Sequence, residues 1–183
     1  MHGFVWVILF SMAGPTVAAD QLTSPYRDQA STEIRALSEK EILELREGRG
    51  MGLARAAELN GYPGPRHVLD AAQAGRLHLS ADQAQRVRLL FDGMAHEAQR
   101  LGGLILREEQ GLENEFRAGR IGEADLKTRV DRIATLQGQL RAVHLRAHLG
   151  TRSVLSEDQI QHYNELRGYT GAAPHEPQPH ERH

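Results

Sequence analysis

The stretch that decides the fold is residues 79–120, which read LSADQAQRVRLLFDGMAHEAQRLGGLILREEQGLENEFRAGR. Apolar side chains recur in it at steps of three, four or seven, which is the periodicity of one face of an α-helix. They are Val87, Leu90, Phe91, Met94, Ala98, Leu101, Ile105, Leu112 and Phe116. The pattern predicts one long amphipathic helix over residues 80–117.

A second apolar stripe follows the short turn Ala118-Gly119-Arg120. It comprises Leu126, Val130, Ile133, Leu136, Leu140, Val143 and Ala147. Two long helices joined by so short a connection run antiparallel. No stretch alternates β-branched and polar residues between turns, so strands are not expected. The chain is therefore predicted to be all-α, with a long antiparallel helical hairpin at its centre.

Three sequence signals mark the starts of helices. They are Leu37-Ser38-Glu39-Lys40-Glu41, Leu79-Ser80-Ala81-Asp82-Gln83 and Leu155-Ser156-Glu157-Asp158-Gln159. Each is a capping box, in which the serine accepts a hydrogen bond from the N3 amide and the N3 Glu or Gln side chain reaches back to the serine amide. The leucine before each box can pack on the N4 residue, which is Ile42, Ala84 or Ile160.

Shorter helices are expected on both sides of the hairpin. The predicted ranges are 38–47, 51–59 and 65–74 before it and 156–168 after it, with a break at residues 60–65. Four glycines, Gly93, Gly102, Gly103 and Gly111, fall inside the first long helix, and each costs roughly 1 kcal/mol relative to Ala. Such glycines let another backbone approach closely, allow a bend, or are merely tolerated.

The two ends of the chain have compositions of their own. Residues 4–10 are apolar and Val17-Ala18-Ala19 precede Asp20, as in a cleavable signal peptide. The apolar core is too short for the roughly 20 residues of a membrane span, so we expect export to the periplasm, cleavage after Ala19 and no stable span afterwards. Residues 20–64 then form a helical extension and residues 65–169 the hairpin domain. The His- and Pro-rich tail, residues 170–183, is expected to be disordered.

Composition narrows the classes of function. The chain has no cysteine, which removes disulfides and thiolate chemistry. A net charge of −2, with arginines interleaved among acids, argues against nucleic-acid binding. Gly48-x-Gly50-x-Gly52 follows a helix and lacks the Lys of a phosphate loop, and no Gly-x-Ser-x-Gly elbow occurs. No catalytic residues are expected, and we predict that the protein is not an enzyme.

The pairing of Leu79-Ser80-Ala81-Asp82-Gln83 with Leu155-Ser156-Glu157-Asp158-Gln159 around a hairpin resembles the Spy/CpxP family. Members are periplasmic all-helical proteins with two Leu-Thr-x-x-Gln motifs, and here Ser80 and Ser156 stand in place of Thr. The resemblance covers residues 65–168, and residues 48–65 also look like an N-terminal extension of a subgroup. It implies a homodimer of hairpins forming a cradle, which in the Spy branch shields unfolded clients without ATP. The implied partners are unfolded or envelope proteins, or a membrane-bound signalling protein.

Related CnrX and ZraP types are heavy-metal sensors or resistance proteins, so the histidines of this chain are candidate metal ligands. His144 and His148 are spaced i and i+4, which puts both rings on one helix face, where they could bind zinc, nickel or copper. Two ligands are too few, so a third would come from His96, Glu97, Glu108 or Glu109. His144 also lies on the apolar stripe, which leaves a purely structural role open.

Other candidate ligands are weaker. The tail residues His175, His180 and His183, among glutamates, could hold a divalent metal loosely. Met51 and Met94 are the only methionines beyond the signal region, which disfavours a thioether copper(I) site. Glu108 and Glu109 are expected on a solvated face.

Two functions stay open on these grounds. The favoured one is an ATP-independent chaperone or envelope-stress accessory protein, and the alternative is a periplasmic heavy-metal sensor or resistance protein. A structural envelope adaptor is third.

Overall fold

The computed structural model describes residues 24–27 and 31–169, and this part of the chain is helical with no strand, which confirms the all-α prediction. The helices in order are α1 (Glu39–Glu47), α2 (Arg55–Glu58), α3 (Pro65–Gln73), α4 (Ala81–Arg117), α5 (Glu123–Val154) and α6 (Glu157–Arg167). The predicted signal peptide and the tail histidines His175, His180 and His183 lie outside the described residues.

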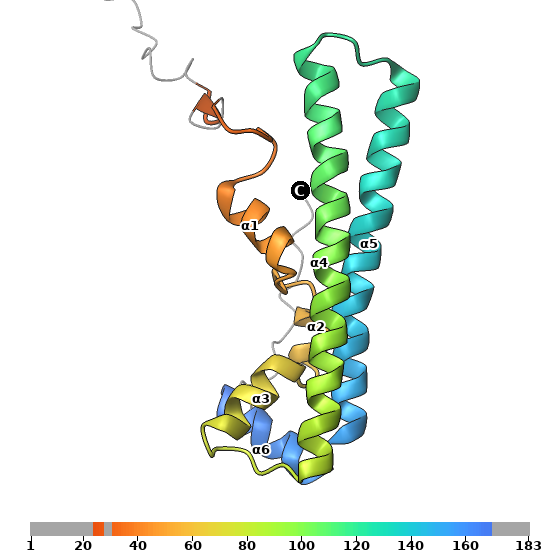
Figure 1. Cartoon of the computed structure of the whole chain (residues 1–183). Helices are drawn as coiled ribbons and strands as arrows, with labels where there is room; N and C mark the ends of the chain where they lie inside the picture. The colour runs from red at the N-terminus through yellow and green to blue at the C-terminus, as the bar shows by residue number, and fades with distance from the viewer. Residues whose placement is uncertain (1–23, 28–30, 170–183) are drawn as a thin grey trace, which may run out of the picture.

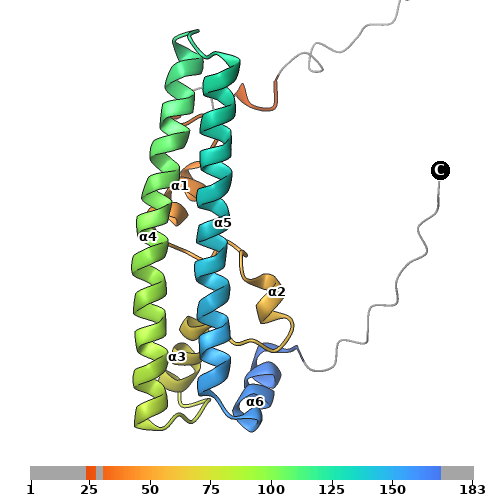
Figure 2. The same cartoon turned by 90° about the vertical axis from the view of Figure 1, so that its right-hand side faces the viewer.

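Helices α4 and α5 form the long antiparallel hairpin that the two apolar stripes predict (Figures 1 and 2). A short turn joins them, in which Gly119 adopts a left-handed φ of 63°. The other helices gather along one part of this hairpin. Helix α1 lies beside the middle of α4, whereas α3 and α6 lie at the end farthest from the turn (Figure 1).

Two apolar clusters hold this arrangement together. The cluster at the far end comprises Val68, Leu69, Leu77, Val87, Leu155, Ile160 and Tyr163. The cluster under α1 comprises Leu45, Ala98, Leu101, Ile105, Leu136 and Leu140. We call residues 81–105 and 133–154, together with α1, α2, α3 and α6, the base. We call residues 106–132 the tip.

The tip has no buried residue. Phe116 and Val130, which belong to the two apolar stripes, are 54% and 47% exposed. Their exposure has a physical reason. At the tip each long helix contacts mainly its one hairpin partner, and a single helix contact cannot cover a whole apolar face. From the N-terminal segment, Arg35 and Glu33 reach α4 as far as Glu113 and Arg117.

All three predicted capping boxes are present, at Ser38, Ser80 and Ser156, and both reciprocal hydrogen bonds form in each. The helix predicted over 51–59 is wrong in extent, because only Arg55–Glu58 is helical. Met51 and Gly52 interrupt it, with left-handed φ angles of 48° and 74°. Among the described residues, no helix has the length and apolar character needed to cross a membrane.

The glycines of α4 divide into two kinds. A Cβ on Gly102 would overlap the carbonyl oxygen of Leu45, so this glycine lets the backbone of α1 rest directly on α4. A Cβ on Gly111 would meet the guanidinium of Arg129 from α5. A Cβ on Gly93 would have no neighbour within 4 Å, and one on Gly103 would meet only the Arg107 side chain, at 3.8 Å. The close-approach explanation therefore holds at Gly102, whereas Gly93 has open space.

Candidate functional site

The two Leu-Ser-x-x-Gln motifs meet at the base. The side-chain amides of Gln83 and Gln159 pair reciprocally, with Nε2 to Oε1 distances of 2.9 and 3.0 Å. Gln83 Nε2 also donates to the carbonyl of Val154 at 3.0 Å, and Gln159 Nε2 donates to that of His78 at 2.7 Å. The glutamines thus cap their own helices and also fasten the start of α4 to the start of α6.

A buried carboxylate, Glu58 of α2, ties together four parts of the base. Its Oε1 accepts hydrogen bonds from the hydroxyls of Tyr163 at 2.6 Å and Tyr169 at 3.1 Å. Oε2 accepts one from the amide of Gly64 at 3.2 Å. The guanidinium of Arg167 lies 3.3 Å from Oε1. This carboxylate is 9% exposed and is compensated by these partners.

Two histidines complete the surroundings of Glu58. The Nδ1 atoms of His67 and His148 each lie 3.6 Å from one of its oxygens. Burial by itself would raise the pKa of Glu58, but the interactions with His67 and Tyr163 and the charges of His67 and His148 lower it to about 2. Glu58 is therefore ionised at neutral pH. Burial and the nearby carboxylate raise the pKa of Tyr163, which remains a hydrogen-bond donor.

The structure buries both histidines of the predicted metal pair. His148 Nδ1 lies 2.7 Å from the carbonyl oxygen of Tyr62, so this nitrogen carries the proton and donates. His144 is 3% exposed, and its Nε2 is buried without a hydrogen-bond partner in the described part of the chain. Burial and the charge of His148 lower the pKa of His144, which keeps its imidazole neutral at pH 7.

None of the four expected third ligands joins this pair. His96 is exposed, and Glu97 pairs with Arg100 at 2.7 Å. Glu108 and Glu109 belong to the tip and are half-buried, which corrects the expectation of a solvated face. Burial raises the pKa of Glu109. Over residues 24–27 and 31–169, no group of three or more His, Cys, Asp or Glu side chains is placed to hold a metal ion.

Two adjoining cavities lie beside the histidine pair. Their volumes are about 490 and 600 Å³. Both are lined by Gly50, His67, His144 and His148. The loop of residues 48–52 and helix α5 therefore both contribute to the lining of the two cavities. We call this pair of cavities the histidine cavity.

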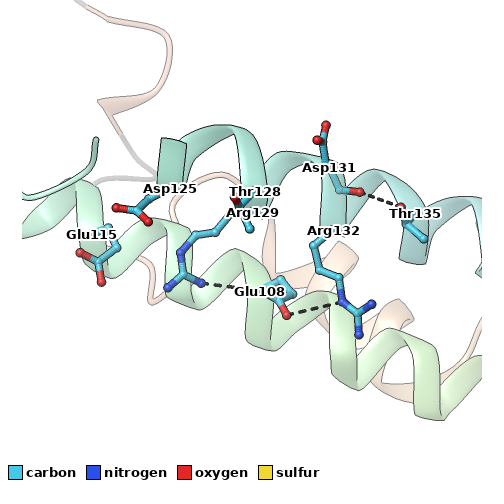
Figure 3. A pocket seen from close by; sticks show the side chains of 8 residues that line it. All are labelled: Glu108, Glu115, Asp125, Thr128, Arg129, Asp131, Arg132 and Thr135. Carbon is cyan, nitrogen blue, oxygen red and sulfur yellow. Dashed lines mark hydrogen bonds and ion pairs between the residues drawn. The ribbon is translucent and has the colours of Figure 1, made fainter. Parts of the chain in front are cut away.

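A different groove of about 620 Å³, lined by charged residues and threonines, lies between α4 and α5 at the tip (Figure 3). Glu108 of α4 sits between two guanidinium groups of α5, 3.6 Å from Arg129 and 3.9 Å from Arg132. Glu115 and Asp125 lie farther along the same groove toward the turn (Figure 3). The tip thus carries charges of both signs in addition to its exposed apolar side chains Phe116 and Val130.

Comparison with known proteins gave no match to a family model, to a curated protein or to a solved structure. The resemblance to the Spy/CpxP family therefore rests on the two motifs and the predicted hairpin between them.

Sequence reasoning missed Glu58 and the glutamine pairing. The partners of Glu58 are spread from position 64 to position 169, and no local pattern connects them. The sequence did contain a signal for the pairing of Gln83 with Gln159. The same motif begins α4 and α6, and an antiparallel hairpin brings the chain back to the end at which α4 begins.

Proposed function

We propose that this protein binds partly unfolded proteins in the bacterial envelope without ATP, as a Spy/CpxP-like chaperone or stress accessory. The supporting observation is the tip, residues 106–132, which has no buried residue although its sequence carries apolar stripes. Phe116 and Val130 are about half exposed there, and Leu112, Ile121 and Leu126 are half-buried.

The chemistry of the tip suits weak and reversible binding. Dispersed apolar side chains gain free energy when they cover exposed apolar segments of a client. The flanking arginines and glutamates hasten encounter and keep the surface soluble. Such a surface requires no closed pocket and no nucleotide.

Self-association and export belong to the same proposal. Two hairpins side by side would form the cradle that the family resemblance implies, and would cover part of the apolar area of α4 and α5. Sedimentation of the mature chain at micromolar concentration should show a dimer. Mass spectrometry of the envelope fraction should show an N-terminus at Asp20.

The decisive experiment is an aggregation assay with the mature chain, free of metal and ATP, at a near-stoichiometric ratio to an unfolding client. Wild type should slow aggregation. The variant Phe116→Ser with Val130→Ser should lose most of this activity. The matched control is Leu89→Ser with Leu149→Ser, because these base residues are 64% and 56% exposed. Equal activity of the two double variants would refute the tip as the client surface.

Metal sensing or resistance remains the second candidate, favoured by the buried, unpartnered Nε2 of His144 next to His148. Under the chaperone proposal, His144→Ala with His148→Ala keeps the anti-aggregation activity, and so does deletion of residues 170–183. If metal-free protein is inert against several clients, while zinc, nickel or copper binds tightly through His144 and His148, the sensor function replaces the chaperone.

A further inference from the structure

We propose that the histidine cavity binds a small organic anion with an apolar body, and that Arg55 pairs with its carboxylate. This site lies in the base, apart from the client surface proposed for the tip, and does not depend on it.

The charge balance of the cavity favours an anion. Each acid that lines it already has an arginine partner: Glu47 pairs with Arg49, Asp70 with Arg66 and Glu58 with Arg167. Arg55 also lines the cavity, but it has no ion pair within the described residues. One guanidinium is therefore left without a counter-ion, and its planar donors match a carboxylate.

The buried histidines of α5 supply polar groups to the same lining. His144 Nε2 is buried without a hydrogen-bond partner in the described chain, and such orphaned groups in a folded protein call for an explanation. His148 Nδ1 donates to the carbonyl of Tyr62, so Nε2 is the ring nitrogen left for a ligand. A bound ligand with a polar edge would give these nitrogens partners.

Apolar side chains form part of the lining of both cavities, and the cavities have the size of a small-molecule site. Met51, Ala54 and Leu59 line one of the two cavities, and Phe91 and Met94 line the other. Volumes of about 490 and 600 Å³ are within the usual range for small-molecule sites. Met51 holds a left-handed φ of 48°, a conformation that is uncommon for a residue other than glycine and tends to occur at ligand clamps.

Indole-3-acetate is a suitable probe, because the only tryptophan of the chain is Trp6, in the segment predicted to be removed. The indole fluorescence of the probe is then observed against tyrosine alone. Wild-type mature protein should bind one probe molecule saturably. The uncharged analogue indole-3-acetamide should bind about tenfold more weakly, as expected for loss of one charge-assisted pair.

Two pairs of variants locate the site. Arg55→Gln should weaken binding about tenfold, whereas Arg88→Gln, which removes an exposed arginine of α4, should not. Gly50→Phe should block the cavity, whereas Gly50→Ala should bind like wild type, since a Cβ at Gly50 has nothing within 4 Å. Thermal unfolding checks that each variant is folded. The tip variant Phe116→Ser with Val130→Ser should keep full probe binding.

Several results would overturn the proposal. They are equal affinity for acid and amide, equal weakening by Arg55→Gln and Arg88→Gln, or unchanged binding to Gly50→Phe. Absence of saturable binding of indole-3-acetate, phenylacetate and hexanoate to wild type would overturn it as well. None of these results bears on the aggregation assay, so the two proposals fail separately.

Discussion

The base and the tip are built from the same two helices, yet they differ in what covers them. In the base, α1, α2, α3 and α6 pack against α4 and α5, and buried side chains recur along both long helices. In the tip, residues 106–132, no side chain is buried. An apolar stripe therefore predicts a helix, but it does not determine which other helices pack against that stripe. We therefore expect the base to contribute most of the stability of the fold, whereas the tip leaves apolar side chains exposed.

The polar groups of the two regions differ in the same way. Glu58 in the base is buried and surrounded by donors. The tip pairs, such as Glu108 with Arg129, are partly solvated, and pairs of that kind contribute little to stability. Substitutions in the base should therefore lower the free energy of unfolding strongly, and substitutions in the tip should change it little.

The largest effect is expected for Glu58→Ala. It leaves Arg167 and the hydroxyls of Tyr163 and Tyr169 without their shared acceptor, so the free energy of unfolding should fall by about 3 kcal/mol. Glu115→Ala at the tip is the matched control, since Glu115 is half-buried and lies 3.8 Å from the exposed Arg120. Its effect should be below about 0.5 kcal/mol. Urea unfolding followed by circular dichroism measures both, and equal losses would contradict the comparison.

Acid should destabilise the base in two stages. The folded-state pKa of His144 is lowered below 6.5 by burial and by His148, so the unfolded chain takes up that proton first and stability falls as pH drops below 6.5. Glu58 has a folded-state pKa of about 2 against an ordinary value of 4.5, so its contribution is full above pH 4.5 and is lost toward pH 2.

Urea unfolding at a series of pH values tests these two stages. His144→Leu should remove the upper stage, and Glu58→Gln should remove the lower one. A stability that stays constant from pH 7 to pH 3 would show that neither group is held as the structure has it.

Gly102→Ala should cost about 2 kcal/mol, because the new methyl group would overlap the carbonyl of Leu45 and displace α1 from α4. Gly93→Ala in the same helix meets nothing within 4 Å and should stabilise the protein by up to about 1 kcal/mol. If the base is packed as described, the melting temperature falls for Gly102→Ala and rises for Gly93→Ala. A stabilising Gly102→Ala would show that α1 does not rest there.

A smaller loss of stability than that of Gly102→Ala is expected at the caps. Ser80→Ala and Ser156→Ala should each cost about 1 kcal/mol, with function retained, because each serine caps a helix. A double-mutant cycle of Gln83→Ala and Gln159→Ala should add a coupling of about 1 kcal/mol from the paired amides. Lost activity at unchanged stability would make the serines binding residues instead.

Much of the fold could be predicted from local chemistry. The capping boxes at Ser38, Ser80 and Ser156 predict where α1, α4 and α6 begin, because each is formed by residues within one turn. The apolar periodicity predicts α4 and α5. The prediction of a helix over residues 51–59 failed for an equally local reason. Met51 and Gly52 adopt left-handed backbone conformations, which interrupt the helix that the composition favours.

The candidate sites could not be predicted to the same depth. The pairing of His144 with His148 follows from i and i+4 spacing, but their neighbours Glu58 and His67 come from other elements and depend on tertiary packing. The exposure of Phe116 and Val130 depends on how far the covering helices extend. The periodicity of α4 and α5 holds no information about that length.

The central claim is that clients bind the tip and leave the base unchanged. Hydrogen exchange of the mature chain, measured with and without an unfolding client and read out as peptides across α4 and α5, tests it most directly. Without client, amides of residues 106–132 should exchange faster than those of residues 81–105 and 133–154. With client, protection should rise in residues 106–132. Protection that rises only in the base, or nowhere while aggregation is still slowed, would contradict the account.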